Sequence, residues 1–219
     1  MKDMKHLTMI SCLVLALLVW VASSADAQSA SGRAYGAYVK TPVASLARAP
    51  LATLTSVTDG DIATASADAL SVPSTLSSNF LDSRTVGSTG EGGAASAQSV
   101  ASLANISILD GLITVDQVIA STTSTSGASG ASSNADGSTF ENLVVAGVAV
   151  TSGDGTVEPN TRITLPGTGY VVLNEQIPSG DGVTTSGLTV NMIHVVLTNV
   201  LGSRTGEIIV GSATSSVTP

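Results

Sequence analysis

The chain has almost no cysteine or tryptophan. Its one cysteine, Cys12, and its one tryptophan, Trp20, both lie in the first 27 residues. The remaining residues therefore exclude disulfides and cysteine-ligated metal sites. A chain of this length can bury on the order of 70% of its unfolded surface, so apolar burial alone can stabilise it.

Charged and aromatic residues are also scarce, at 11% and 3% of the chain. Acidic residues outnumber basic ones by 16 to 8, for a net charge of -8. This sign argues against binding nucleic acid or an anionic membrane by overall charge, and it favours solubility. The few aromatic side chains would make sugar-stacking platforms scarce.

The N-terminal segment has the pattern of a secretory signal peptide. Lys2 and Lys5 precede an apolar stretch, residues 7–22, and small residues flank Asp26 before the expected cleavage site after Ala27. The alternatives are an uncleaved membrane anchor, for which the apolar run is shorter than the usual ~20 residues, and lipidation at Cys12. We expect residues 1–27 to be removed and the protein to be secreted or displayed at the cell surface, without further membrane association.

A hairpin in residues 103–120 is the clearest structural signal. A two-residue turn at Asp110-Gly111 would place Ile108 opposite Ile113 and Ile106 opposite Val115. These four side chains then share one face, while polar side chains occupy the other. A single apolar face needs a second layer to cover it, which predicts a sheet inside a larger antiparallel structure.

The rest of residues 28–219 reads as a single all-β domain, because turn signals separate strand-like runs and helical periodicity is missing. We expect an antiparallel β-sandwich, with a β-solenoid as the alternative. Residues 41–97 suggest edge strands and long loops, and Ser/Thr/Gly/Ala-rich residues near 85–97 and 121–138 suggest flexible loops. The predicted strands are 33–39, 140–150, 162–165, 170–176, 188–201 and 207–213, with 140–150 buried on both faces.

Catalytic candidates are few. His194 is the one histidine beyond the leader, and its place among apolar alternating residues favours a hydrogen-bonded core residue over a catalytic one. One histidine without cysteine also excludes a His/Cys zinc site. A carboxylate pair for glycoside hydrolysis could come from Glu141, Glu158, Glu175 and Glu207. Glu175 and His194, with neighbouring carboxylates, are the residues that an alternative hydrolase would use.

Calcium is the one metal that the sequence suggests. Asp59, Asp61, Asp154 and Asp181 would supply oxygen donors from Gly-rich loops. The same Asp-Gly pairs are what tight hairpin turns require, and neither an EF-hand nor a Gly-rich nonapeptide repeat is present. Turn formation is therefore preferred over calcium binding.

Several segments together resemble the choice-of-anchor P family of bacterial secreted proteins. The landmarks, in order, are residues 31–39, 101–114, 165–176, 188–195 and 206–213. The resemblance implies an exported or surface bacterial domain whose activity is unassigned, and it transfers no catalytic residue.

Two function classes follow. The favoured one is an exported, non-enzymatic β-domain with a structural or adhesive role, meeting envelope or extracellular matrix components and needing no cofactor. The alternative is an extracellular hydrolase or carbohydrate-binding module that uses Glu175 and His194, with calcium as a candidate ion.

Overall fold

The computed structural model describes residues 28–55, 57 and 60–218. The predicted signal peptide and Asp59 lie outside the described residues. Within these ranges the protein is all-β, and the helical content is one 3-10 turn, Glu91–Gly93. Two multi-stranded antiparallel sheets pack on a shared apolar core. The prediction of an all-β sandwich is therefore confirmed over the solenoid alternative.

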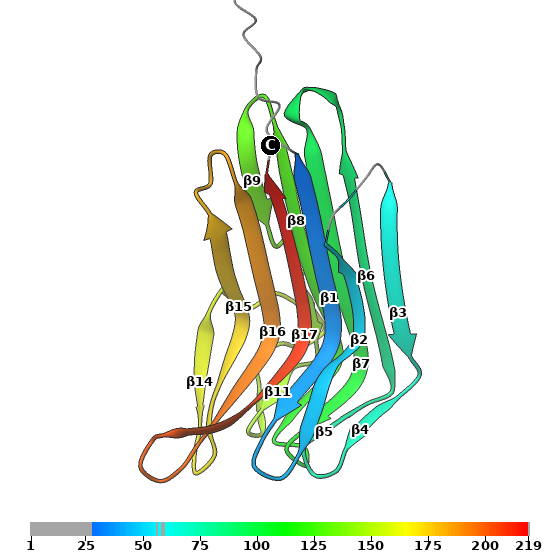
Figure 1. Cartoon of the computed structure of the whole chain (residues 1–219). Helices are drawn as coiled ribbons and strands as arrows, with labels where there is room; N and C mark the ends of the chain where they lie inside the picture. The colour runs from blue at the N-terminus through cyan, green and yellow to red at the C-terminus, as the bar shows by residue number, and fades with distance from the viewer. Residues whose placement is uncertain (1–27, 56, 58–59, 219) are drawn as a thin grey trace, which may run out of the picture.

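Six strands form the first sheet, in the order β14-β15-β16-β17-β1-β2 (Figure 1). The first and last described strands lie side by side within it, because β17 pairs with β1. The bounds are β1 Ser29–Lys40, β2 Ser45–Leu54, β14 Thr161–Leu165, β15 Gly169–Gly180, β16 Ser186–Thr198 and β17 Arg204–Thr218.

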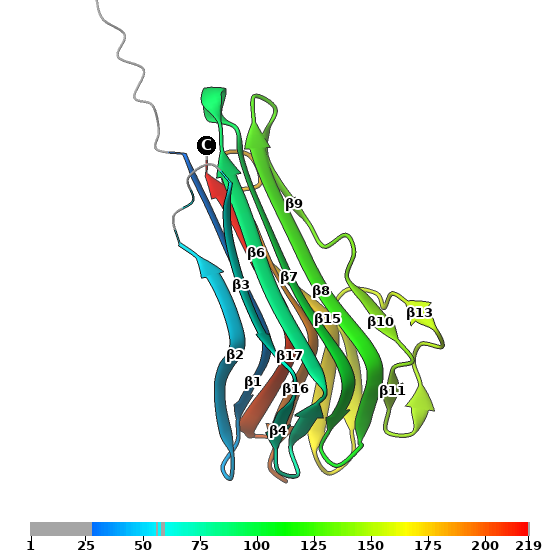
Figure 2. The ribbon, with the colours of Figure 1, turned by 90° about the vertical axis from the view of Figure 1, so that its right-hand side faces the viewer.

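The second sheet has eleven strands, many of them short, and is built around the long strands β6, β7 and β8 (Figure 2). Its bounds are β3 Asp61–Ala67, β4 Leu70–Val72, β5 Leu76–Ser78, β6 Phe80–Thr89, β7 Ala95–Ile108, β8 Ile113–Gly127, β9 Gly130–Asn134, β10 Thr139–Glu141, β11 Val144–Val145, β12 Val148–Ala149 and β13 Asp154–Gly155.

The β7–β8 hairpin has the predicted turn and register. Asp110 and Gly111 have φ values of 53° and 87°, and Ile108 pairs with Ile113 as Ile106 pairs with Val115. All four isoleucine and valine side chains are buried. The hairpin therefore places its predicted apolar face in the core.

The flexible loops predicted near 85–97 and 121–138 are wrong. Most of these residues belong to β6, β7, β8 and β9. In residues 41–97 the predicted edge strands are confirmed by β2 and β3, whereas the predicted long loops are wrong, because most of the segment is strand.

The serine and threonine side chains of residues 85–97 and 121–138 fill one half of the interior, where Ser124 Oγ and Ser215 Oγ lie 2.7 Å apart across the two sheets. A methyl group on Gly32 would overlap the hydroxyl of Thr85 there. The two sheets approach closely here, and only small side chains such as serine and threonine fit between them.

The strands change the face that they present to the core at mid-length. In β17, Ile208 and Val210 are buried, and then Ala213 is, with Gly211 at φ 65° between them. Asn174 in β15 has a φ of 49° at the neighbouring point of the sheet. Such local irregularities re-aim the side chains that follow. They explain why 188–201 looks apolar on both faces: its buried positions change parity within the strand.

The long strand predicted at 140–150 is also wrong. Ala146 and Gly147 have φ values of 50° and 78° and form a tight turn, across which Val145 pairs with Val148. Val148 is 67% exposed. The segment is therefore split among β10, β11 and β12 and is not buried on both faces.

Candidate functional site

His194 lies between two carboxylates on the outer face of the six-stranded sheet. Its Nδ1 is 2.9 Å from Glu175 Oε2, and its Nε2 is 3.4 Å from Glu207 Oε2. The three residues come from adjacent strands, β15, β16 and β17. Their side chains are 14–22% exposed. We call these three residues the Glu-His-Glu cluster.

Polar neighbours fix the Glu175 side of this cluster. Asn191 donates from Nδ2 to Glu175 Oε2 at 2.7 Å, and Ser212 donates to Asn191 Oδ1 at 2.8 Å. The hydrogen bond with His194 lowers the pKa of Glu175; partial burial opposes this, and the Asn191 hydrogen bond adds to the lowering. Glu175 is therefore held as an acceptor-only carboxylate.

Arg204 completes the Glu207 side, where its Nη2 donates to Glu207 Oε2. The buried Nε2 of His194 has no hydrogen-bond partner among the described residues, although Glu207 lies just beyond hydrogen-bonding range. A substrate hydroxyl that reached Nε2 would have to displace Glu207. One ring nitrogen of His194 faces Glu175 and the other faces Glu207. The two carboxylates therefore lie on opposite sides of the ring, and the three side chains do not converge on one ion.

The prediction that His194 is a hydrogen-bonded core residue is confirmed for the hydrogen bond, and the side chain is only 14% exposed, but the predicted strand face is wrong. Ile193 and Val195 occupy the core, whereas His194 lies between them and points outward. Leu188 and Val190 are buried at even-numbered positions, which predicts that His194 is buried too. The buried core positions become odd-numbered in the middle of β16, so His194 projects from the outer face. The prediction that Glu175 could pair with His194 is confirmed by their contact.

The other glutamates do not join this cluster. Glu141 lies in β10 of the second sheet, and Glu158 is exposed in the segment that precedes β14. Glu207 was one of four equal candidates in the sequence, and the register of β16 with β17 brings it next to His194.

The calcium candidates are spread over the molecule. Asp61 begins β3, Asp154 is exposed in β13, and Asp181 lies in the β15–β16 turn. Among residues 28–55, 57 and 60–218, groups of three or more His, Cys, Asp or Glu side chains that could hold a metal are not found.

Asp181 is engaged by its own turn. Its Oδ1 accepts from the backbone N–H groups of Val183, Thr184 and Thr185 at 2.8–2.9 Å. The Thr184 hydroxyl donates to Oδ2 at 2.5 Å. This hydroxyl bond first, and the backbone bonds with it, hold the pKa of Asp181 below its ordinary value. The geometry is that of a turn anchor.

Arginine–tyrosine stacks lie on the same outer face as the Glu-His-Glu cluster. The guanidinium of Arg48 is 5.4 Å from the ring centroids of both Tyr35 and Tyr38. That of Arg162 is 3.7 Å from the ring of Tyr170. These contacts are within cation–π range. All three tyrosines of the chain are thus on this sheet.

Charge is unequally divided between the two sheets. The strands of the six-stranded sheet carry five basic and two acidic residues, a net charge of +3. Those of the eleven-stranded sheet carry one basic and five acidic residues, a net charge of -4. The first sheet carries the basic residues Arg33, Lys40, Arg48, Arg162 and Arg204 and the acidic residues Glu175 and Glu207. The second sheet carries the basic residue Arg84 and the acidic residues Asp61, Asp82, Asp116, Glu141 and Asp154.

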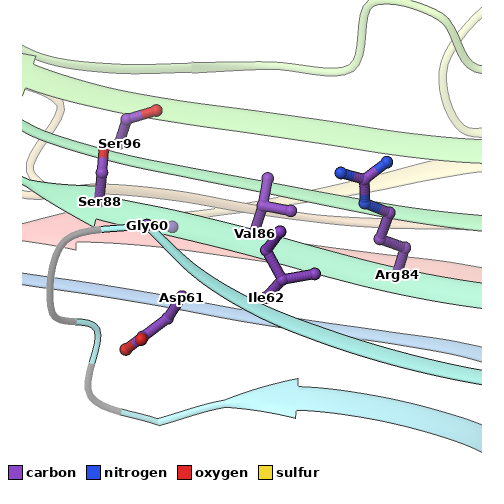
Figure 3. A pocket seen from close by; sticks show the side chains of 8 residues that line it. Gly60, Asp61, Ile62, Arg84, Val86, Ser88 and Ser96 are labelled. Atoms are coloured by element: carbon purple, nitrogen blue, oxygen red, sulfur yellow. The ribbon is translucent and has the colours of Figure 1, made fainter.

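Two hollows differ in chemistry. One of about 290 Å³ lies beside the Glu-His-Glu cluster and is lined by Lys40 and residues 204–207. The other, about 300 Å³, lies on the second sheet, where Ile62 and Val86 are adjacent and Asp61 points away from them (Figure 3). The first hollow adjoins charged groups, whereas the second is mainly aliphatic at its centre.

Comparison with protein-family models, with curated proteins and with solved structures gives no match. None of the elements in the described part of the chain is a helix long and apolar enough to cross a membrane.

Proposed function

We propose that the protein is an exported, non-enzymatic β-sandwich that attaches to envelope or extracellular matrix material through the outer face of its six-stranded sheet. The observation that carries this proposal is the concentration of basic and tyrosine side chains on one sheet of an acidic protein. A surface opposite in charge to the rest of its protein directs a partner to one face.

The rigidity of that face supports a binding role. Arg48 is held against Tyr35 and Tyr38, while Glu175 is held by Asn191 and His194. Side chains ordered before binding lose less conformational entropy when a partner arrives. The signal-peptide pattern and the resemblance to choice-of-anchor P proteins agree with an exported, surface-associated role.

A hydrolase is the second candidate, because Glu175 orients the His194 ring at 2.9 Å as a carboxylate does in a catalytic pair. The position of Glu207 weighs against it: the second ring nitrogen faces a carboxylate 3.4 Å away, where a nucleophile would need to be. A carbohydrate-binding module that stacks sugars on tyrosine is less favoured, because arginines already cover these rings.

The test is binding of the purified protein to envelope and matrix fractions of the cells that encode it. Arg48→Glu should weaken binding, whereas Arg84→Glu, which makes the same charge change on the other sheet, should not. Equal loss in both variants, or no binding by the unaltered protein, would reject the proposed face. Substrate turnover abolished by His194→Ala or Glu175→Gln would favour the hydrolase instead.

A further inference from the structure

We infer that the outer face of the six-stranded sheet binds a linear acidic polysaccharide, one whose carboxylates are separated by hydroxyl groups. This inference rests on the proposed function and names the chemistry of its partner. The juxtaposition that carries it is a band of side chains that crosses the strands and has an exposed arginine at each end, Arg48 on one edge strand and Arg162 on the other.

Cross-strand register aligns this band from Tyr38, whose ring Arg48 contacts, to Arg162. Tyr38, Ile209, His194 and Val172 are successive partners on β1, β17, β16 and β15, and Arg162 pairs next on β14. Directly opposite residues in antiparallel strands project from the same face. Strands lie 4.7–4.9 Å apart, so the path from β2 to β14 is about 24 Å long. An extended polymer can follow such a path, whereas a single small anion would occupy one point.

The arginines retain donors for an anion. A guanidinium stacked on a tyrosine uses its face for the ring and keeps its N–H edge for other partners. Arg48 and Arg162 both make cation–π contacts with tyrosine rings, and both are exposed to solvent. A guanidinium edge matches a carboxylate with two parallel hydrogen bonds. Each end of the band therefore presents a pre-oriented carboxylate-binding group.

Lys40 provides a cation nearer the middle. It is exposed at the end of β1, opposite Glu207 in register, and lines the hollow of about 290 Å³ with residues 204–207. This hollow is bounded by Lys40 and Arg204. It is large enough for one acidic group and its hydration.

The two carboxylates between these cations determine which kind of polymer can bind. Glu175 and Glu207 lie within the band, where a polymer without hydroxyl groups between its charges, such as DNA or polyglutamate, would meet them with repulsion. A polysaccharide that alternates carboxylates with hydroxyls can place its hydroxyl donors there. The mixture of cations and carboxylates therefore favours an acidic sugar polymer over DNA or a polyglutamate chain.

Binding to polygalacturonate, measured with the full-length exported protein, tests the inference. We expect binding in dilute buffer that is lost at about 1 M salt, where the Debye length falls to about 3 Å, and no binding to the neutral polymer pullulan. Lys40→Glu and Arg162→Glu should each weaken it roughly tenfold, because attraction of the order of a surface ion pair is replaced by repulsion. Arg84→Glu is the charge-matched control and should leave binding unchanged.

The other outcomes overturn the inference in distinguishable ways. Envelope binding that stays sensitive to Arg48→Glu, without polygalacturonate binding, rejects the acidic polysaccharide and leaves the proposed function standing. Absence of binding to both rejects the two together. Equal affinity for double-stranded DNA or polyglutamate rejects the polysaccharide class, and equal weakening by Arg84→Glu rejects the face. Circular dichroism and melting curves of each variant, matched to those of the unaltered protein, show whether it is folded.

Discussion

Gly32→Ala should destabilise the protein strongly, because the two sheets leave no space for a methyl group at this position. The added carbon would overlap Thr85 Oγ1 and lie 2.7 Å from Ser99 Oγ. Relief requires the two hydroxyls to move apart and to break their buried hydrogen bond of 2.9 Å. Overpacking costs about 1–3 kcal/mol and an unsatisfied buried hydroxyl about 1–3 kcal/mol more. We expect a total loss of about 3 kcal/mol.

Chemical denaturation measures this loss of unfolding free energy. The melting temperature should fall by about 6–12 °C for a domain of this size. Gly127→Ala is the matched control, because a methyl group there meets nothing within 4 Å; its effect should stay below about 1 kcal/mol. Thr85→Ala in the Gly32→Ala background removes the overlapping atom and should recover at least about 1 kcal/mol relative to additivity. Equal effects of Gly32→Ala and Gly127→Ala would refute close packing of the hydroxyl-rich half.

Four further predictions concern other parts of the molecule. His194→Ala should cost about 1–3 kcal/mol by removing the hydrogen bond with the partly buried Glu175 carboxylate; a neutral effect in denaturation would contradict the cluster. The pKa of Glu175 is lowered from 4.5 in the folded protein, so its stabilising contribution is complete above pH 4.5 and is lost as pH falls through the lower folded value; Glu175→Gln should flatten this acid limb, and an unchanged limb would argue against the pairing. Gly211→Ala, at φ 65°, should destabilise by at least about 1 kcal/mol, and a neutral result would contradict the face change. Asp181→Ala should loosen its turn without altering any calcium-dependent melting shift; a shift present in the unaltered protein and lost in this variant would establish calcium binding there.

Local chemistry was enough to predict the central hairpin. Asp110 and Gly111 have the predicted positive φ values, as Leu109 before them also does, and the alternation of Ile106 and Ile108 fixes the face. Turn and pattern agreed, so the register followed from the sequence. The same alternation misplaced His194, because the strand changes its buried face near Met192, and a period of two cannot continue through that change.

The serine- and threonine-rich strands were missed for a different reason. Composition distinguishes polar from apolar residues but does not show that Ser124 faces Ser215 across a narrow interior. The threonine residues of the segment carried a usable signal, because β-branched side chains favour strands. Packing between sheets decided the outcome, and such packing is a tertiary property.

The candidate site was partly predictable. Glu175 and His194 were recognised as a possible pair, whereas Glu207 reaches the ring through the β16–β17 register. The stack of Arg162 on Tyr170 had a signal in the sequence: the turn at residues 166–168 brings the flanking strands together. The division of charge between the sheets needed the strand order, since neighbours in space are far apart in the chain.

Radical footprinting of the tyrosines during binding to envelope or matrix material tests the central claim most directly. Tyr38 and Tyr170 are partly exposed on the six-stranded sheet, and Phe80 on the second sheet is 48% exposed. We predict that Tyr38 and Tyr170 lose reactivity on binding while Phe80 keeps its reactivity. Protection of Phe80, with both tyrosines unchanged, would contradict the assignment of the binding surface.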